Sequence, residues 1–307
     1  MQATLAHPIT LDGVGLHSGA PARLRLNPAP ADHGIVFVRL FSDGRAVSIP
    51  ARWNRVEQVE LCTRLRSDDG VEISTIEHVM AALAGCGVHN ARIEIDGPEV
   101  PILDGSSAPF VSEILRVGIA RQDAPVRALR VLDVVEVRNG PAYARLEPAD
   151  GLEIDFSIDF VDAAIGRQSK HLSMANGTFV HELCDSRTFC RRADVDAMRE
   201  RGLALGGSYD NAVVVDGAEV LNPGGLRHAD EAVRHKMLDA LGDLALAGGP
   251  ILGRYTGVRA GHALTNALLR TLFARSGAVR WVEADAETLV RLPGAGLRAS
   301  DARLLAA

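Results

Sequence analysis

The segment 234–243, RHKMLDALGD, has polar residues at helical spacing. At about 100° per residue, a helix brings His235, Asp239 and Asp243 to one face, with Lys236 at its edge. The opposite face is apolar and consists of Met237, Leu238, Leu241, Leu244 and Ala245. An imidazole and a carboxylate four residues apart can bind one metal ion, and both groups suit Zn²⁺. A solvated polar face opposite a core gives the same pattern, so both interpretations stay open.

The segment 74–78, STIEH, contains the other groups that a metal-dependent hydrolase needs. His78 could be a third ligand, and the adjacent Glu77 could take a proton from the attacking water. Three protein ligands and an open position are typical of catalytic zinc sites, whereas structural zinc sites have four protein ligands. Ser74 and Glu77 also fit a capping box, in which the Glu77 carboxylate only satisfies the helix start.

His262 opens another predicted helix, after Arg259, Ala260 and Gly261. A helix N-terminus disfavours a protonated imidazole. A nearby carboxylate such as Asp243 would reverse that preference and keep a proton available for a departing amine. Without such a partner, a lone histidine of this kind is more often structural.

These residues belong to two halves with the same order of elements. In the first half we expect strands over 22–26, 35–40, 71–73 and 91–95, and helices over 74–84 and 104–117. In the second half we expect strands over 131–137, 142–146, 152–160 and 251–258, and helices over 230–247 and 262–275. Aligning His78 with His235 also aligns Met80 with Met237, which suggests a duplication. The predicted fold class is α+β, with two similar layered domains that each contain a sheet and a helix pair.

Residues 122–126 are the most linker-like part of the chain, which divides it into domains 1–124 and 125–307. Residues 191–221 interrupt the second domain as an insertion with a short helix and a strand at Val213.

The composition is that of a globular protein with a full core. Of 307 residues, 47% are hydrophobic and 23% are charged. A formal net charge of −6 argues against a nucleic-acid partner or a polybasic membrane anchor. The N-terminus lacks a signal-peptide pattern, and no apolar run reaches the roughly 18 residues of a membrane span. The four cysteines lack CxxC spacing, which predicts reduced thiols in a cytoplasmic protein.

Several motifs follow one another along the chain: GVGLHSG (13–19), LCT (61–63), STIEHVMAALAG (74–85), PILDGSSAPFV (101–111), SRTF (186–189), GGSYDNAVVVD (206–216), VRHKMLDALGD (233–243) and AGHAL (260–264). In this order they resemble the UDP-3-O-acyl-N-acetylglucosamine deacetylases, the zinc amidases of lipid A synthesis. The resemblance covers nearly the whole chain.

The resemblance implies a β-α-α-β sandwich of two domains. It implies hydrolysis of the 2-acetamido group of UDP-3-O-(3-hydroxyacyl)-N-acetylglucosamine, the committed step of lipid A synthesis. One catalytic Zn²⁺ would be bound by His78, His235 and Asp239, although such a donor set also holds Fe²⁺ or Co²⁺. We expect a monomer whose partner is this acylated UDP-sugar, with no nucleic acid and no integral membrane segment.

The resemblance also implies the roles of the other groups. Glu77 matches the carboxylate that activates water, and His262 matches the general acid, with Asp243 paired to it. Thr188 matches the hydroxyl that helps hold the oxyanion, and Lys236 matches a group at the polar head of the substrate.

Further substrate contacts are expected at Phe189, Arg259, Leu16 and Gly207, and the insertion 191–221 would form the passage for the acyl chain. Some members of the family have a lysine near the position of Pro141 that assists the diphosphate. This chain has none there, so Arg259 could interact with the charge of the diphosphate. Two alternatives remain: a zinc amidase for another acylated sugar, and a catalytically silent metal-binding protein. The presence of both Glu77 and His262 argues against the second alternative.

Overall fold

The computed structural model describes residues 1–298 and 300–301. The end of the predicted C-terminal domain, residues 302–307, lies outside the described residues. The chain is a mixed α+β protein with several sheets and a packed helical centre. Its helices are α1 (Glu77–Gly85), α2 (Ala108–Val117), α3 (Arg192–Glu200), α4 (Glu231–Ala245), α5 (His262–Ala274) and α6 (Ala286–Leu289). One 3₁₀ turn spans Trp53–Arg55, and a π-helical segment spans Phe179–Leu183.

The first half of the chain forms a five-stranded sheet in the order β2 (Ile9–Val14), β3 (Pro21–Pro28), β9 (Ala91–Ile95), β4 (Ile35–Leu40) and β5 (Ala46–Pro50). Strand β9 runs antiparallel to β3 and parallel to β4. In β3, buried Leu24 and Leu26 alternate with the exposed residues Arg23 and Arg25. One face of the sheet is therefore apolar and needs a cover.

The second half forms a seven-stranded sheet from β11 (Arg127–Val131), β12 (Val135–Asn139), β13 (Ala142–Glu147), β14 (Leu152–Asp159), β15 (Arg167–Ser173), β19 (Ile251–Val258) and β20 (Val279–Glu283). Strand β19 pairs with β11 and β14 in parallel and with β13 in antiparallel orientation. The single strand expected over 131–137 is wrong. The segment belongs to two strands: β11 ends at Val131 and pairs with β20, whereas β12 begins at Val135 and pairs with β13. Exposed Leu132 and Val134 lie in the connection between them.

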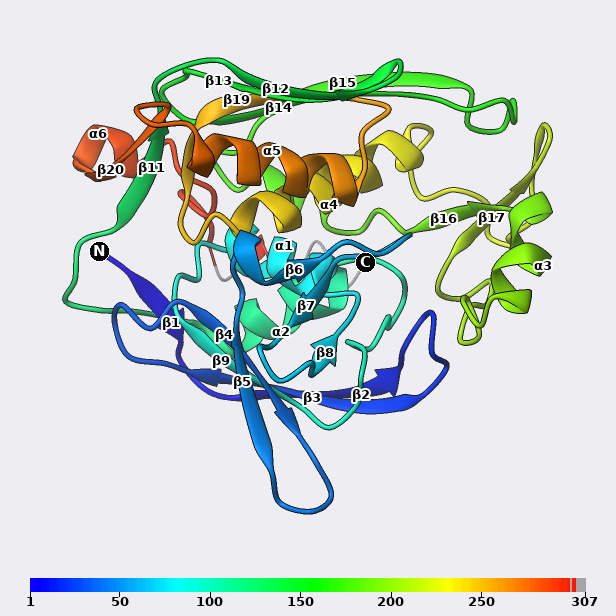
Figure 1. Cartoon of the computed structure of the whole chain (residues 1–307), viewed down its shortest axis with the longest axis horizontal. Coiled ribbons are helices and arrows are strands. Elements are labelled where there is room, and N and C mark those ends of the chain that lie inside the picture. The colour runs from blue at the N-terminus through cyan, green and yellow to red at the C-terminus, as the bar shows by residue number, and fades with distance from the viewer. Residues whose placement is uncertain (299, 302–307) are drawn as a thin grey trace.

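Helices α1, α4 and α5 lie between the two large sheets (Figure 1). Figure 1 shows α4 and α5 under the seven-stranded sheet, and α1 between these helices and the five-stranded sheet. Helices α1 and α4 pack directly against each other. An ideal Cβ at Gly242 of α4 would lie 2.1 Å from the Glu77 carbonyl oxygen, so only glycine permits this approach.

The structure excludes two of the alternative interpretations that the sequence left open for these helices. Helix α1 begins at Glu77, its N-cap residue is Ile76, and no side chain caps it, so the capping box does not form. Helix α4 is buried on nearly all sides, and His235, Asp239 and Asp243 are at most 5% exposed. The solvated polar face is therefore excluded, and these polar groups need partners inside the protein.

Smaller sheets complete the fold. The expected insertion, residues 191–221, contains α3, β17 (Val213–Asp216) and β18 (Glu219–Val220). These two strands and β16 (Phe189–Arg191) form a three-stranded sheet at one side of the molecule (Figure 1). Strands β6 (Val56–Glu57), β7 (Arg64–Arg66) and β8 (Glu72–Ile73) precede α1.

The expected linker, residues 122–126, is hydrogen-bonded to the N-terminal segment of the chain. Strand β1 (Ala3–Leu5) pairs with β10 (Ile119–Arg121), and the Gln122 backbone N–H donates to the Gln2 carbonyl. Within the described part of the chain, no helix combines the length and apolar character needed to cross a bilayer.

Candidate metal centre

Three side chains from α1 and α4 form a possible metal site. His78, His235 and Asp239 each offer one ligand atom, and these atoms lie within 4.8 Å of one another. The Asp239 Oδ1 atom is 3.3 Å from His235 Nε2 and 3.7 Å from His78 Nε2. Atoms bound tetrahedrally to one Zn²⁺ at about 2.1 Å lie about 3.4 Å apart, so this spacing suits the ion.

The surroundings prepare these groups as ligands. Burial lowers the pKa of His235, and it lowers the pKa of His78 to about 3, so both rings are neutral at pH 7. His235 Nδ1 lies 3.0 Å from the Ser186 carbonyl oxygen. That oxygen only accepts, so Nδ1 carries the proton and Nε2 keeps a lone pair for a metal.

Only one oxygen of the Asp239 carboxylate accepts a hydrogen bond from the described residues. Its Oδ2 atom accepts from Lys236 Nζ at 2.5 Å, whereas its buried Oδ1 has no hydrogen-bond partner among the described residues. Burial opposes ionisation, but His235 and Lys236 hold the pKa of Asp239 well below its usual range. A buried anionic oxygen without a donor is costly, and a cation between Oδ1 and the two rings would satisfy it.

A carboxylate and an imidazole lie beside this centre. His262 Nε2 is 3.8 Å from Glu77 Oε1, and His262 Nδ1 is 2.8 Å from Asp243 Oδ2. Burial raises the pKa of Glu77 to about 7, with Asp239 and Asp243 acting in the same direction. Burial opposes a charged His262, but Asp243 and Glu77 outweigh it and raise the pKa of His262 to about 9.

Thr63 joins these groups, and sequence reasoning gave it no role. Its backbone N–H donates to Glu77 Oε2 at 3.0 Å, and its Oγ1 donates to Asp243 Oδ1 at 2.5 Å. The only sequence signal was its position in the LCT motif, because no periodic pattern links residue 63 to residue 243.

Of the remaining predicted site residues, Phe189 contacts a candidate ligand, and the others have contacts elsewhere. The Phe189 ring packs edge-on against His235, with 6.2 Å between ring centroids. Thr188 precedes it, and its backbone is held by the Gly105 carbonyl. Leu16 lies beside Gly207, where an added Cβ would be 3.7 Å from Leu16 Cδ1. Arg259 is exposed and ion-paired with Asp159.

His17 lies in the glycine-rich motif GVGLHSG, and the sequence predicts no role for it. It is 8% exposed, and neither ring nitrogen has a hydrogen-bond partner among the described residues. Burial lowers its pKa. Its turn is fixed by Glu99, which accepts from the backbone N–H groups of His17 and Ser18.

Comparison with known proteins identifies the family to which the chain belongs. The model of the LpxC family, described as UDP-3-O-acyl N-acetylglycosamine deacetylase, matches residues 2–274. The chain belongs to this family. The match includes every residue discussed above as a ligand, proton-transfer group or substrate contact.

Curated relatives agree with this assignment. A UDP-3-O-acyl-N-acetylglucosamine deacetylase of Anaeromyxobacter sp. (strain Fw109-5) is 49% identical over 95% of both chains. Proteins of the same name from Shewanella woodyi and Shewanella oneidensis are 47% and 46% identical. The matches cover 90% of this chain and 91% of the S. woodyi protein, and 95% and 97% for S. oneidensis. The chain is therefore similar to deacetylases, which are hydrolases, over most of its length.

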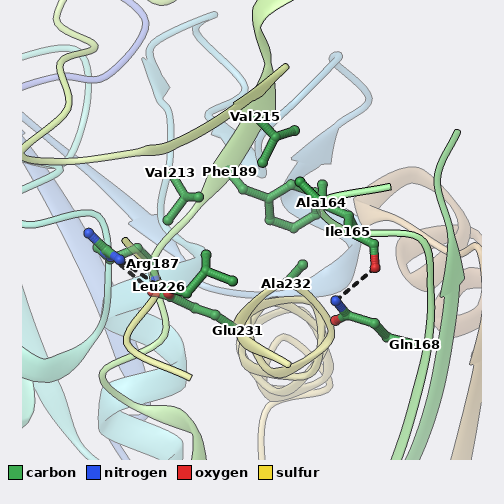
Figure 2. Close-up of a pocket in the computed structure, with 10 residues that line it drawn as sticks. All are labelled: Ala164, Ile165, Gln168, Arg187, Phe189, Val213, Val215, Leu226, Glu231 and Ala232. Carbon is green, nitrogen blue, oxygen red and sulfur yellow. Dashed lines mark hydrogen bonds and ion pairs between the residues drawn. The ribbon is translucent and has the colours of Figure 1, made fainter. Parts of the chain in front are cut away.

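Two cavities lie near the helices that carry this LpxC-family centre. Figure 2 shows the smaller one, of about 10 Å³, with Phe189, Val213 and Val215 around it and Ala232 of α4 below. It has room for about one water molecule at most. It marks the seam between the insertion and α4, where buried Glu231 accepts from Arg187, and it is too small for an acyl chain.

The larger cavity, of about 610 Å³, includes Leu83 and Ala84 near the end of α1 and Ala245 at the end of α4. None of the candidate ligands or proton-transfer groups lines it. The two helices thus approach each other closely at Gly242 and lie beside a wide cavity near their C-terminal ends.

Proposed function

We propose that this protein hydrolyses the 2-acetamido group of UDP-3-O-(3-hydroxyacyl)-N-acetylglucosamine, with Zn²⁺ as its metal, in lipid A synthesis. One observation carries the proposal. In a chain of the LpxC family, a buried His-His-Asp group adjoins a base–acid pair, and one Asp239 oxygen has no hydrogen-bond partner in the described part of the chain. A purely structural metal would need neither Glu77 nor His262 beside it.

His78, His235 and Asp239 would hold the ion. When bound, Zn²⁺ supplies Lewis-acid polarisation of the amide carbonyl and makes a water molecule more acidic. Glu77 takes one proton from the attacking water, whose oxygen bonds to the acetyl carbon. Asp243 accepts from His262 Nδ1, which directs the Nε2 proton toward the centre.

The carbon–nitrogen bond then breaks, and His262 Nε2 protonates the departing amine. The products are acetate and the free 2-amino sugar. Thr188 would donate its hydroxyl proton to the oxyanion of the tetrahedral intermediate. Lys236 is already bonded to Asp239, so its charge lies next to the centre and can interact with the polar part of the substrate.

The sugar and acyl chain would be bound by residues around this centre. Phe189 offers an aromatic face next to His235, where a sugar ring can pack. Leu16 and Gly207 join the glycine-rich turn 13–19 to the insertion 191–221, which we propose forms the acyl passage. Arg259 could exchange its exposed partner Asp159 for the diphosphate.

We further propose two similar domains, 1–124 and 125–307, packed as a β-α-α-β sandwich. The support is that each half has one large sheet, and that α1 and α4 supply corresponding histidines. The four cysteines are free thiols, which supports a reducing cytoplasm. All candidate ligands come from one chain, which supports a functional monomer.

The test is deacetylation of the acylated UDP-sugar by the purified protein, read as release of the free amine. The protein is assayed as isolated, after chelation, and after return of one equivalent of Zn²⁺. We expect activity to be lost and then restored. UDP-N-acetylglucosamine without the acyl chain is the matched control, and we expect much slower turnover. No turnover of the acylated substrate by metal-loaded protein would refute the proposal.

A further inference from the structure

We propose that Thr63 is a positioning residue that orients both carboxylates of the proton-transfer machinery. The inference rests on the proposed function, because it assumes that Glu77 is the base and that Asp243 supports the acid His262. Thr63 itself would touch neither the substrate nor the metal.

The contacts of Thr63 connect two helices. Thr63 is 3% exposed and lies between β6 and β7, outside both α1 and α4. Its backbone N–H reaches Glu77 on α1, and its hydroxyl reaches Asp243 on α4. One residue therefore fixes two acidic side chains from different halves of the chain.

Thr63 determines which oxygen of each carboxylate is available to His262. Glu77 Oε2 and Asp243 Oδ1 accept from Thr63. Glu77 Oε1 is thereby left 3.8 Å from His262 Nε2, and Asp243 Oδ2 is left 2.8 Å from His262 Nδ1. The described residues provide no other hydrogen bond to the two oxygens that Thr63 occupies. Loss of its donors would thus leave Glu77 without this anchor and would leave Asp243 held only through His262.

The backbone around Thr63 is itself anchored. Its carbonyl accepts from the Ile76 N–H at the N-cap of α1, and the next residue, Arg64, pairs with Glu57 across β6 and β7. Hydroxyl-to-carboxylate bonds of this length are charge-assisted and stronger than neutral ones. Thr63 is thus a fixed donor against which Asp243 is oriented.

The first experiment compares Thr63→Val with Thr63→Ser. Valine keeps the shape and the backbone N–H but lacks the hydroxyl, so we expect kcat to fall about 10- to 100-fold with KM changed less than about twofold. Serine keeps both donors and should retain kcat within about threefold. Zinc content should remain at one equivalent in both variants.

Thr4→Val is the matched control. Thr4 is also buried, and its hydroxyl donates to the Asn90 carbonyl, remote from Glu77 and Asp243. A similar loss of kcat in Thr4→Val would mean that any buried threonine matters equally, and this would overturn the inference. Wild-type kcat in Thr63→Val would overturn it as well.

A second readout needs no turnover. The Nδ1 proton of His262, which faces Asp243, should give a downfield ¹H NMR signal, assigned by its loss in His262→Gln. We expect this signal to shift in Thr63→Val and to stay unchanged in Thr4→Val. An unchanged signal in Thr63→Val contradicts the inference even if the wild type proves inactive. An inactive, zinc-loaded wild type contradicts only the proposed function.

Discussion

At the scale of single residues, Glu77 and His262 hold complementary protonation states. Burial raises the pKa of Glu77 to about 7, and Asp243 and Glu77 overcome burial to raise the pKa of His262 to about 9. Between these values Glu77 is an ionised base while His262 is a protonated acid. Environments that separate two titrating groups in this way are typical of acid–base catalysis.

These pKa values predict a bell-shaped pH dependence of kcat/KM. Activity should rise as Glu77 ionises near pH 7 and fall as His262 loses its proton near pH 9. A bound cation favours the ionised carboxylate and the neutral imidazole, so it moves both limbs to lower pH. Asp243→Asn removes a carboxylate that raises the His262 pKa, so the basic limb should move further down. A basic limb that stays in place in this variant would contradict the role of Asp243.

The adjacent residues Glu77 and His78 allow the role of a general base to be compared with the role of a metal ligand. Glu77→Gln removes the charge but keeps an oxygen for the Thr63 N–H, so we expect kcat to fall about 10²- to 10⁴-fold with zinc retained. His78→Gln should instead lose zinc, because a ligand is removed. Activity assays and metal analysis of both variants make the comparison. Full activity in Glu77→Gln would refute its role as the base.

At the scale of elements, the packing of α1 against α4 determines the spacing of the candidate metal ligands. Helix α1 carries His78, helix α4 carries His235 and Asp239, and the two backbones approach closely at Gly242. The distance between the ligands therefore depends on a residue that has no side chain.

We expect Gly242→Ala to damage both stability and metal binding. Its Cβ would lie 2.1 Å from the Glu77 carbonyl oxygen, so the helices must move apart, at a cost of about 1–3 kcal/mol. The unfolding temperature and the zinc affinity should both be lower than in the wild type. Gly224→Ala is the control, because nothing lies within 4 Å of its Cβ position. Unchanged zinc affinity in Gly242→Ala would contradict this view of the helix contact.

Strong local patterns made several elements predictable. Strands β4, β9 and β19 have the expected bounds, and α4 differs from the expected helix by one residue at the start and two at the end. Strand β15 was missed because none of its residues is buried, which leaves no apolar alternation to detect. Its structure depends on pairing with β14 rather than on its own sequence.

The candidate site was predictable in part for the same reason. His235, Asp239 and Asp243 share a helix, so their common face follows from local geometry. The burial of that face does not, because it requires α1 and the sheets to cover α4. The capping-box interpretation of Glu77 was wrong because a distant donor, Thr63, holds that carboxylate.

At the scale of the whole molecule, a bound ion would connect the two halves. His78 precedes the expected linker, and the other two candidate ligands follow it. A ligand that binds only the folded state stabilises it, by about 4 kcal/mol at a thousandfold excess over Kd.

Removing the metal should therefore lower the unfolding temperature of the whole chain. We expect calorimetry to show a decrease of several degrees after chelation, reversed by Zn²⁺ but not by Mg²⁺, which prefers oxygen ligands. His78→Gln should already melt at the lower temperature and show no response to chelation. An equal response in His78→Gln would place the stabilising ion elsewhere.

The division of the ligands between α1 and α4 also sets an order of events during synthesis. A ribosome completes α1 well before it completes α4, so the emerging chain has His78 without its two partners. Until α4 follows, α1, whose Val79, Met80 and Leu83 are buried in the finished protein, lacks the helix against which it packs. The nascent first half is therefore in its most aggregation-prone period at this stage, when a chaperone would have the most to protect. Metal binding by all three candidate ligands must follow the synthesis of α4.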